Sequence, residues 1–123
     1  MPFRVVPKRD RKLNRLLKRG DTRSLARGEV LYQAGAQAET VFLVREGWLL
    51  LAAPEGQGAE RAVGIAGPGE LTGEEGLVRG ARRRTTARAG PPSIVIAVGG
   101  EGVLAALGSS GTSLEAFLRA KEE

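Results

Sequence analysis

The chain has no cysteine and no histidine, and it has few aromatic residues. These absences exclude disulfides, thiol nucleophiles, zinc sites of the usual kind, and Ser-His-Asp or Cys-His catalytic arrangements. Three Phe, one Tyr and one Trp are also few for a protein that stacks on single-stranded nucleic acid. No other nucleophile paired with a base is visible, so we expect no enzyme activity, no metal site and no cofactor.

Long apolar runs are absent as well. No run approaches the ~20 residues of a membrane-spanning helix, and the basic N-terminus lacks the apolar stretch of a signal peptide. Together with the absence of cysteine, this favours a cytoplasmic protein that does not associate with membranes.

The positive charge is concentrated at the N-terminus. Residues 1–27 carry ten Lys or Arg and two Asp, a net charge of +8, whereas residues 28–123 carry nine basic and twelve acidic residues, a net charge of −3. Basic arms contact nucleic acid in some proteins and are solvated segments in others. The length of 123 residues suits one domain. We expect a basic arm with a short helix over residues 1–23 and one folded unit over residues 24–123.

Between residues 24 and 66, short β-like runs alternate with glycine-containing turns. The runs are SLAR, EVLYQ, TVFLVR, WLLLAAP and RAVGIA, and residues 83–89 and 93–98 add two more. Strands and turns at intervals of about ten residues are typical of an all-β sandwich or roll. Helical patterns flank these strands at residues 8–19, at about 100–107 and at 113–121.

The most informative stretch is PGELTGEEGLVRGARRRTTARA, residues 68–89. Gly73 lets a ligand approach the backbone closely, because glycine has no Cβ. Residues 73–79 are expected to form one or two helical turns, whose first N–H groups suit an anion. Glu74 offers a carboxylate acceptor for a sugar hydroxyl.

The second half of the same stretch supplies donors. Arg84 offers a fixed fork of N–H groups for a phosphate, and Thr85 and Thr86 offer hydroxyls and backbone N–H groups. An anion cradle beside a hydroxyl acceptor indicates a sugar phosphate as the ligand. The spacing matches neither a P-loop nor a dinucleotide-binding fingerprint.

An ordered set of residues resembles the cyclic nucleotide-binding domain of the catabolite activator protein and related bacterial regulators. The set comprises Gly28, Gly35, Gly47, Pro68-Gly69-Glu70, Gly73-Glu74 and Arg84-Thr85-Thr86, and the resemblance covers residues 24–107. The ten-residue step from Glu74 to Arg84 is one that this family uses in its phosphate-binding cassette. The resemblance implies a mainly β fold, an antiparallel double-stranded β-helix or jelly-roll-like β-roll of eight strands with short flanking α-helices. It also implies cyclic AMP or cyclic GMP as the ligand.

The resemblance further implies a set of ligand-binding residues. These are Gly73, Glu74, Arg84, Thr85, Thr86, Leu51 and Val63. Arg84 would pair with the cyclic phosphate, and Glu74 would accept the ribose 2′-hydroxyl. The backbone near Gly73 and the Thr85 hydroxyl would add contacts to the phosphate or base. The two apolar residues are candidates for the wall of the site, and equally for ordinary core positions.

Glu75 departs from the family pattern, in which an apolar residue usually follows Gly-Glu. A second carboxylate near a bound phosphate lowers affinity unless it points to solvent. Alternation along an extended segment sends Arg82 and Arg84 to one side and Arg83 to the other, which offers compensation. Up to Glu123 the sequence contains no counterpart of the helix-turn-helix domain that follows in the family's regulators.

Three functions remain open from the sequence. The first is a cyclic nucleotide sensor or regulatory module acting on an unknown protein partner. The second is a degenerate roll, closed by an ion pair between Glu74 and Arg84, that serves as a ligand-free interaction module. The third is nucleic-acid binding through the basic arm. The short apolar face of Leu114, Phe117 and Leu118 favours a monomer or weak homodimer.

Overall fold

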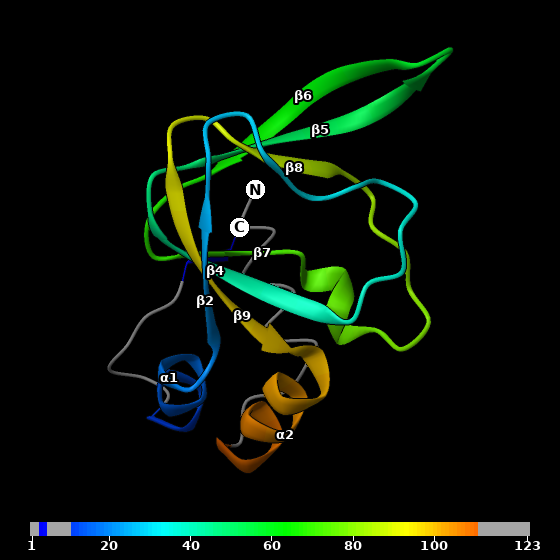
Figure 1. The fold of residues 1–123 in the computed structure, drawn as a ribbon. Helices are drawn as coiled ribbons and strands as arrows, with labels where there is room; N and C mark the ends of the chain where they lie inside the picture. The colour runs from blue at the N-terminus through cyan, green and yellow to red at the C-terminus, as the bar shows by residue number, and fades with distance from the viewer. Residues whose placement is uncertain (1–2, 5–10, 111–123) are drawn as a thin grey trace.

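Two antiparallel β-sheets face each other and form a β-roll (Figure 1). The structure is a computed structural model that describes residues 3–4 and 11–110. The strands are β1 (Phe3–Arg4), β2 (Asp21–Leu25), β3 (Val30–Tyr32), β4 (Thr40–Glu46), β5 (Leu49–Gly56), β6 (Ala59–Ala66), β7 (Glu70–Thr72), β8 (Thr86–Ala89) and β9 (Ser93–Gly99). The helices are α1 (Arg11–Lys18), the 3₁₀ helix η2 (Glu74–Leu77) and α2 (Gly100–Ser110).

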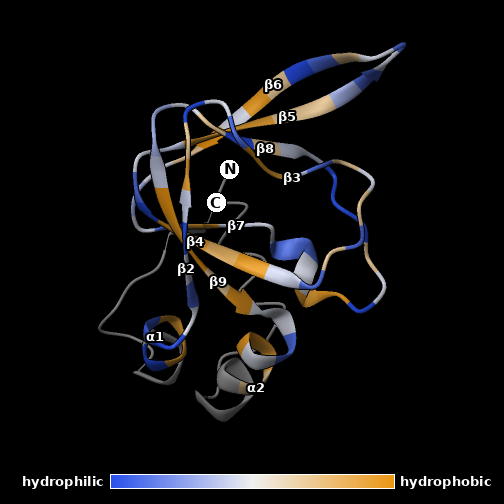
Figure 2. Cartoon of the chain, in the orientation of Figure 1, coloured by the Kyte–Doolittle hydropathy of each residue, from blue (hydrophilic) through white to orange (hydrophobic). Residues whose placement is uncertain are grey.

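The strand order confirms the predicted roll. One sheet runs β1-β7-β4-β9-β2 and the other β3-β8-β5-β6, with antiparallel pairing throughout. Strands β2 to β9 give the eight strands that the resemblance implies, although β7 is not among the seven runs seen in the sequence. Strand β1 adds two residues beside β7. Hairpin β5–β6 extends away from the body of the roll, and its far end is hydrophilic (Figures 1 and 2).

Strand β4 is buried on both faces, which explains its nearly continuous apolar sequence TVFLV. Successive side chains of a strand point to opposite faces. Phe42 and Val44 pack into the core between the two sheets. Val44, Leu49 and Val95 of this core are 0% exposed. Val41 belongs to a second core on the other side of the same strand. The burial of both faces fixes the register of β4.

The second core lies under the helices. Leu17 of α1 and Val103 of α2 are buried there against Leu71 of β7 and Val98 of β9. An eight-residue helix is too short to be stable alone in water, so α1 depends on this apolar contact. The helices therefore cover the outer face of the five-stranded sheet (Figure 1).

Gly47 makes the turn between β4 and β5 possible. Its φ of +79° lies in the left-handed region, and a Cβ at this position would collide with Ser93. A residue with a side chain would be strained both by its backbone conformation and by the lack of space.

Some boundaries differ from the sequence expectations. Strand β2 begins at Asp21, three residues before the expected start of the folded unit. Strand β8 begins only at Thr86, because residues 81–83 bond instead to the loop after β3, with Arg83 N–H donating to Ala36 O over 2.8 Å. Helix α2 extends to Ser110, beyond the expected end near residue 107. The helix expected at 113–121, with its apolar face, lies outside the described residues.

Among the described residues, no helix has the length and apolar character that crossing a membrane requires. The same part of the chain contains no cluster of three or more carboxylate, histidine or cysteine side chains placed to hold a metal ion.

The β4–β5 corner allows a matched test of the core. We expect Leu49→Ala to lower the free energy of unfolding by about 2–5 kcal/mol, because it leaves a cavity between the sheets. Leu50→Ala, at the next position and only half-buried, should cost less than half as much. Urea denaturation of both variants measures the difference, and equal losses would contradict the described orientation of β5.

Candidate functional site

The cassette between β7 and β8 is built around Gly73. This residue has φ +77° and ψ +30°, a left-handed conformation, and it immediately precedes η2. A Cβ here would lie 2.7 Å from Arg83 Nη1 and 3.2 Å from the Phe42 ring. Both the conformation and the space therefore require glycine, and its carbonyl is left facing the Arg83 guanidinium.

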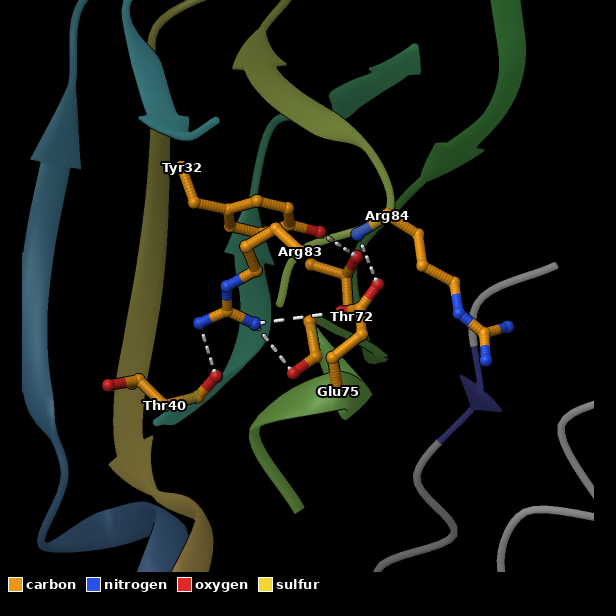
Figure 3. A network of polar contacts seen from close by, with 7 residues as sticks. Tyr32, Thr40, Thr72, Glu75, Arg83 and Arg84 are labelled. Atoms are coloured by element: carbon orange, nitrogen blue, oxygen red, sulfur yellow. Dashed lines mark hydrogen bonds and ion pairs between the residues drawn. The ribbon is translucent and has the colours of Figure 1, made fainter. Parts of the chain in front are cut away.

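Arg83 points into the roll and holds the cassette against β4 (Figure 3). Its Nη1 donates to Gly73 O over 2.8 Å, and its Nη2 donates to Thr40 O over 2.7 Å. The side chain is 4% exposed. A buried guanidinium needs acceptors, and these two carbonyls supply them; Gly73 O also accepts the Gly76 N–H over 2.9 Å. Burial lowers the pKa of Arg83 from its ordinary value, while Tyr32 and Glu75 act in the opposite direction.

The Arg83 guanidinium also lies over two aromatic rings. The Arg83 guanidinium carbon lies 4.4 Å from the centre of the Tyr32 ring and 5.5 Å from that of Phe42. The two rings are stacked, with centres 5.7 Å apart. The Tyr32 hydroxyl forms a 2.9 Å hydrogen bond with Thr72 Oγ1. Tyr32 belongs to one sheet and Phe42 to the other, so Arg83 joins both sheets by cation–π contacts.

Glu75 closes the cassette from η2. Its Oε2 accepts a hydrogen bond from the Arg84 backbone N–H over 3.1 Å, and its Oε1 lies 3.7 Å from Arg83 Nη1. The side chain is 11% exposed, so the carboxylate does not point to solvent. Oε1 is buried and accepts no hydrogen bond from the described residues. The carboxylate therefore lies between two donors that carry or present positive charge.

The predicted alternation of the three arginines is confirmed. Arg82 and Arg84 are exposed, whereas Arg83 is buried. Figure 3 shows the Arg84 side chain directed away from Arg83. The guanidinium of Arg84, predicted to meet the phosphate, thus lies at the surface, and only its backbone N–H enters the cassette.

The other predicted site residues divide into two groups. Glu74 begins η2 and is half-buried, and Thr85 is half-buried directly before β8. Thr86 Oγ1 accepts the Ala34 N–H over 3.0 Å, which gives it a structural partner within the chain. Glu74 and Thr85, together with Gly73, lie around the cassette.

The two apolar candidates are not brought together. Leu51 is half-buried and packs against the core between the sheets. Val63 is 46% exposed on β6. The reason is a register shift in the β5–β6 pairing, where Leu51 faces Gly64 and Ala52 faces Ala62, so that Val63 has no partner. Leu51 lies on the inner side and Val63 does not.

Arg83 and Tyr32 are the residues that the sequence argument did not assign to the site. The signal for Arg83 was present, because alternation separates it from its neighbours and because it stands ten residues after Gly73. No sequence pattern pointed to Tyr32, which reaches the cassette from a strand forty residues away from Thr72.

The roll and its glycine-arginine cassette define a ligand-binding domain of the cyclic nucleotide class. Residues 22–110 match the cyclic nucleotide-binding domain family, and the chain belongs to this family. No curated protein matches the chain.

Several solved structures share the fold. The N-terminal domain of a transcriptional regulator from Streptomyces coelicolor A3(2) is 28% identical, with a TM-score of 0.71 over 90% of this chain and 79% of that one. The Thermus thermophilus catabolite activator protein is 24% identical, with a TM-score of 0.74 over 94% of this chain and 51% of that one, so the chain spans about half its length. The regulatory subunit of a cAMP-independent protein kinase A from Trypanosoma brucei is 16% identical, with a TM-score of 0.72 over 84% and 37%.

Two neighbouring arginines provide a test of the buried contact. Arg83→Ala removes the guanidinium donor from Gly73 O and Thr40 O and the buried cation beside the Glu75 carboxylate. We expect it to lower the free energy of unfolding by about 3–5 kcal/mol. Arg84→Ala removes an exposed guanidinium and should change it by less than about 0.5 kcal/mol. Urea denaturation measures both, and a similar loss in the two variants would show that Arg83 does not hold the cassette.

Tyr32 can be titrated alone, because it is the only tyrosine of the chain. Burial raises the pKa of its hydroxyl above the ordinary 10.0, with Thr72 acting in the opposite direction. The folded state therefore holds this proton more tightly than the unfolded chain. Its contribution to stability is complete below pH ~10 and is lost as the pH rises through the raised pKa. Ultraviolet absorbance of tyrosinate should give a pKa above 10 in the folded protein and near 10 in urea; equal values would contradict the burial of Tyr32.

Proposed function

We propose that this chain binds a cyclic nucleotide, cyclic AMP or cyclic GMP, at the cassette and acts as a sensor or regulatory module. The observation that carries the proposal is the convergence of the Arg83 guanidinium and the Arg84 backbone N–H on one point beside Gly73. Two such donors, one of them from a buried guanidinium, suit a singly charged phosphodiester. Membership of the cyclic nucleotide-binding domain family supports the same ligand class.

The proposed roles follow from where the side chains lie. The Arg83 guanidinium and the Arg84 N–H receive the cyclic phosphate, and the exposed Arg84 guanidinium adds positive charge at the surface that attracts it. Glu74 accepts the ribose 2′-hydroxyl, and Thr85 adds a hydroxyl to the phosphate or base. Leu51 contributes to the inner apolar wall. Each group binds or orients the ligand, so we propose recognition rather than catalysis.

A second function is favoured by one observation, namely that the chain's own Glu75 carboxylate already lies between these donors. A roll closed in this way could serve as a ligand-free interaction module. One neighbour in fold is named as part of a cAMP-independent kinase. In this case the ion pair that closes the cassette joins Arg83 to Glu75, in place of the expected Arg84 and Glu74.

The remaining expectations stay predictions. They are a cytoplasmic location, an unknown protein partner, a monomer or weak homodimer, and nucleic-acid contact through the basic arm over residues 1–23.

Thermal-shift titration separates the two functions. A ligand that binds only the folded state raises the melting temperature with its concentration. Cyclic AMP or cyclic GMP should raise it, whereas the open nucleotide 5′-AMP, with a doubly charged phosphate, should not at equal concentration. No shift with either cyclic nucleotide up to millimolar concentration would favour the ligand-free module.

The role of Glu74 has its own test. If its carboxylate accepts the 2′-hydroxyl, the parent chain should bind 2′-deoxy cyclic AMP at least about tenfold more weakly than cyclic AMP. Glu74→Gln should discriminate less between the two ligands, whereas Glu46→Gln, an exposed carboxylate on β4, should discriminate like the parent. Isothermal titration calorimetry gives the four affinities. Equal binding of the two ligands by the parent would exclude this role.

A further inference from the structure

The Glu75 carboxylate occupies the point on which the two phosphate donors of the cassette converge. Its Oε2 takes the Arg84 N–H over 3.1 Å, and its Oε1 lies 3.7 Å from the nearest nitrogen of Arg83 (Figure 3). A carboxylate and a phosphodiester resemble each other here, because each is a singly charged group that presents two oxygens in a fork.

We propose that Glu75 is an internal substitute for the ligand's phosphate, which has to leave the cassette before a cyclic nucleotide can bind. The proposal rests on the proposed function and adds a competing group to it. Glu75 thereby sets the affinity of the site, and the unliganded chain is held in a self-occupied state.

Electrostatics exclude simultaneous occupancy. A phosphate bound to the same two donors would place a negative charge within a few ångströms of the Glu75 carboxylate, in a site that is largely shielded from water. Arg83 is the one guanidinium within ion-pair distance of this carboxylate among the described residues. A single buried cation does not compensate two adjacent anions.

The internal contact is also incomplete, so it can be displaced. Glu75 Oε1 is buried but accepts no hydrogen bond from the described residues. A separation of 3.7 Å is longer than the 2.7–2.9 Å of a charge-assisted hydrogen bond. A buried acceptor without a donor is unfavourable. The backbone of η2 restricts where the Glu75 carboxylate can lie, whereas a phosphate is free to approach both donors. The Glu75 side chain is 11% exposed, so it already borders the solvent into which it would turn.

The expected consequence is a lowered affinity in the parent chain. An intramolecular group acts at a high effective concentration, and the apparent dissociation constant rises as the open fraction of the site falls. Removing the carboxylate should therefore strengthen binding of a cyclic nucleotide by about tenfold or more.

The test compares Glu75→Gln and Glu75→Ala with the parent and with Glu46→Gln, which removes the same charge from an exposed position on β4. Glu75→Gln retains an oxygen for the Arg84 N–H, so it preserves the cassette if Glu75→Ala fails to fold. Calorimetry with cyclic AMP and cyclic GMP gives the dissociation constants. A second titration with inorganic phosphate follows the amide resonance of Arg84 by NMR.

The proposal expects both Glu75 variants to bind at least one cyclic nucleotide tenfold more tightly than the parent, and Glu46→Gln to bind like the parent. Equal or weaker binding in the Glu75 variants would overturn it and leave the proposed function intact. If neither the parent nor any variant binds a cyclic nucleotide, the proposed function fails. The phosphate titration then decides whether Glu75 substitutes for a phosphate in the cassette. A shift of the Arg84 resonance in the Glu75 variants but not in the parent supports the substitution, and a shift in all chains or in none overturns it.

Discussion

The buried guanidinium of Arg83 is the contact through which the two sheets and the cassette are joined. It donates to the carbonyls of Gly73 and Thr40 and lies over the ring of Tyr32, so one side chain contacts β3, β4 and the turn before η2. Burying a charge in this way is unfavourable without acceptors. The left-handed glycine turn, the position of η2 and the stacked aromatic pair together supply the surroundings that stabilise it.

The same guanidinium links stability to ligand binding. In the unliganded chain its charge is balanced by Glu75, and in the proposed complex by a phosphate. The two states differ in the anion that occupies the cassette and share the contacts with the carbonyls and the rings. Glu75 belongs to η2, and η2 contacts α2 beside a groove lined by residues 76–80 and by the start of α2.

Much of the fold follows from local sequence patterns. The apolar runs at 40–45 and 93–98 correspond to β4 and β9, because a short, nearly continuous apolar run is typical of a buried strand. The site could be predicted only in outline. The glycine at position 73 predicted the turn, and the alternation of side chains along an extended segment predicted that Arg83 points away from Arg82 and Arg84. Which arginine enters depends on the pairing of residues 81–83 with the distant loop after β3, and the exposure of Val63 depends on a β5–β6 bulge. Neither is a local property.

A crystal structure of the chain grown with saturating cyclic AMP or cyclic GMP tests the central claim most directly. The phosphate should accept the Arg84 N–H and face the Arg83 guanidinium, the Glu75 carboxylate should have turned away from both, and the Arg83–Tyr32 contact should persist. A complex in which Glu75 still accepts the Arg84 N–H while the nucleotide lies elsewhere would contradict the account.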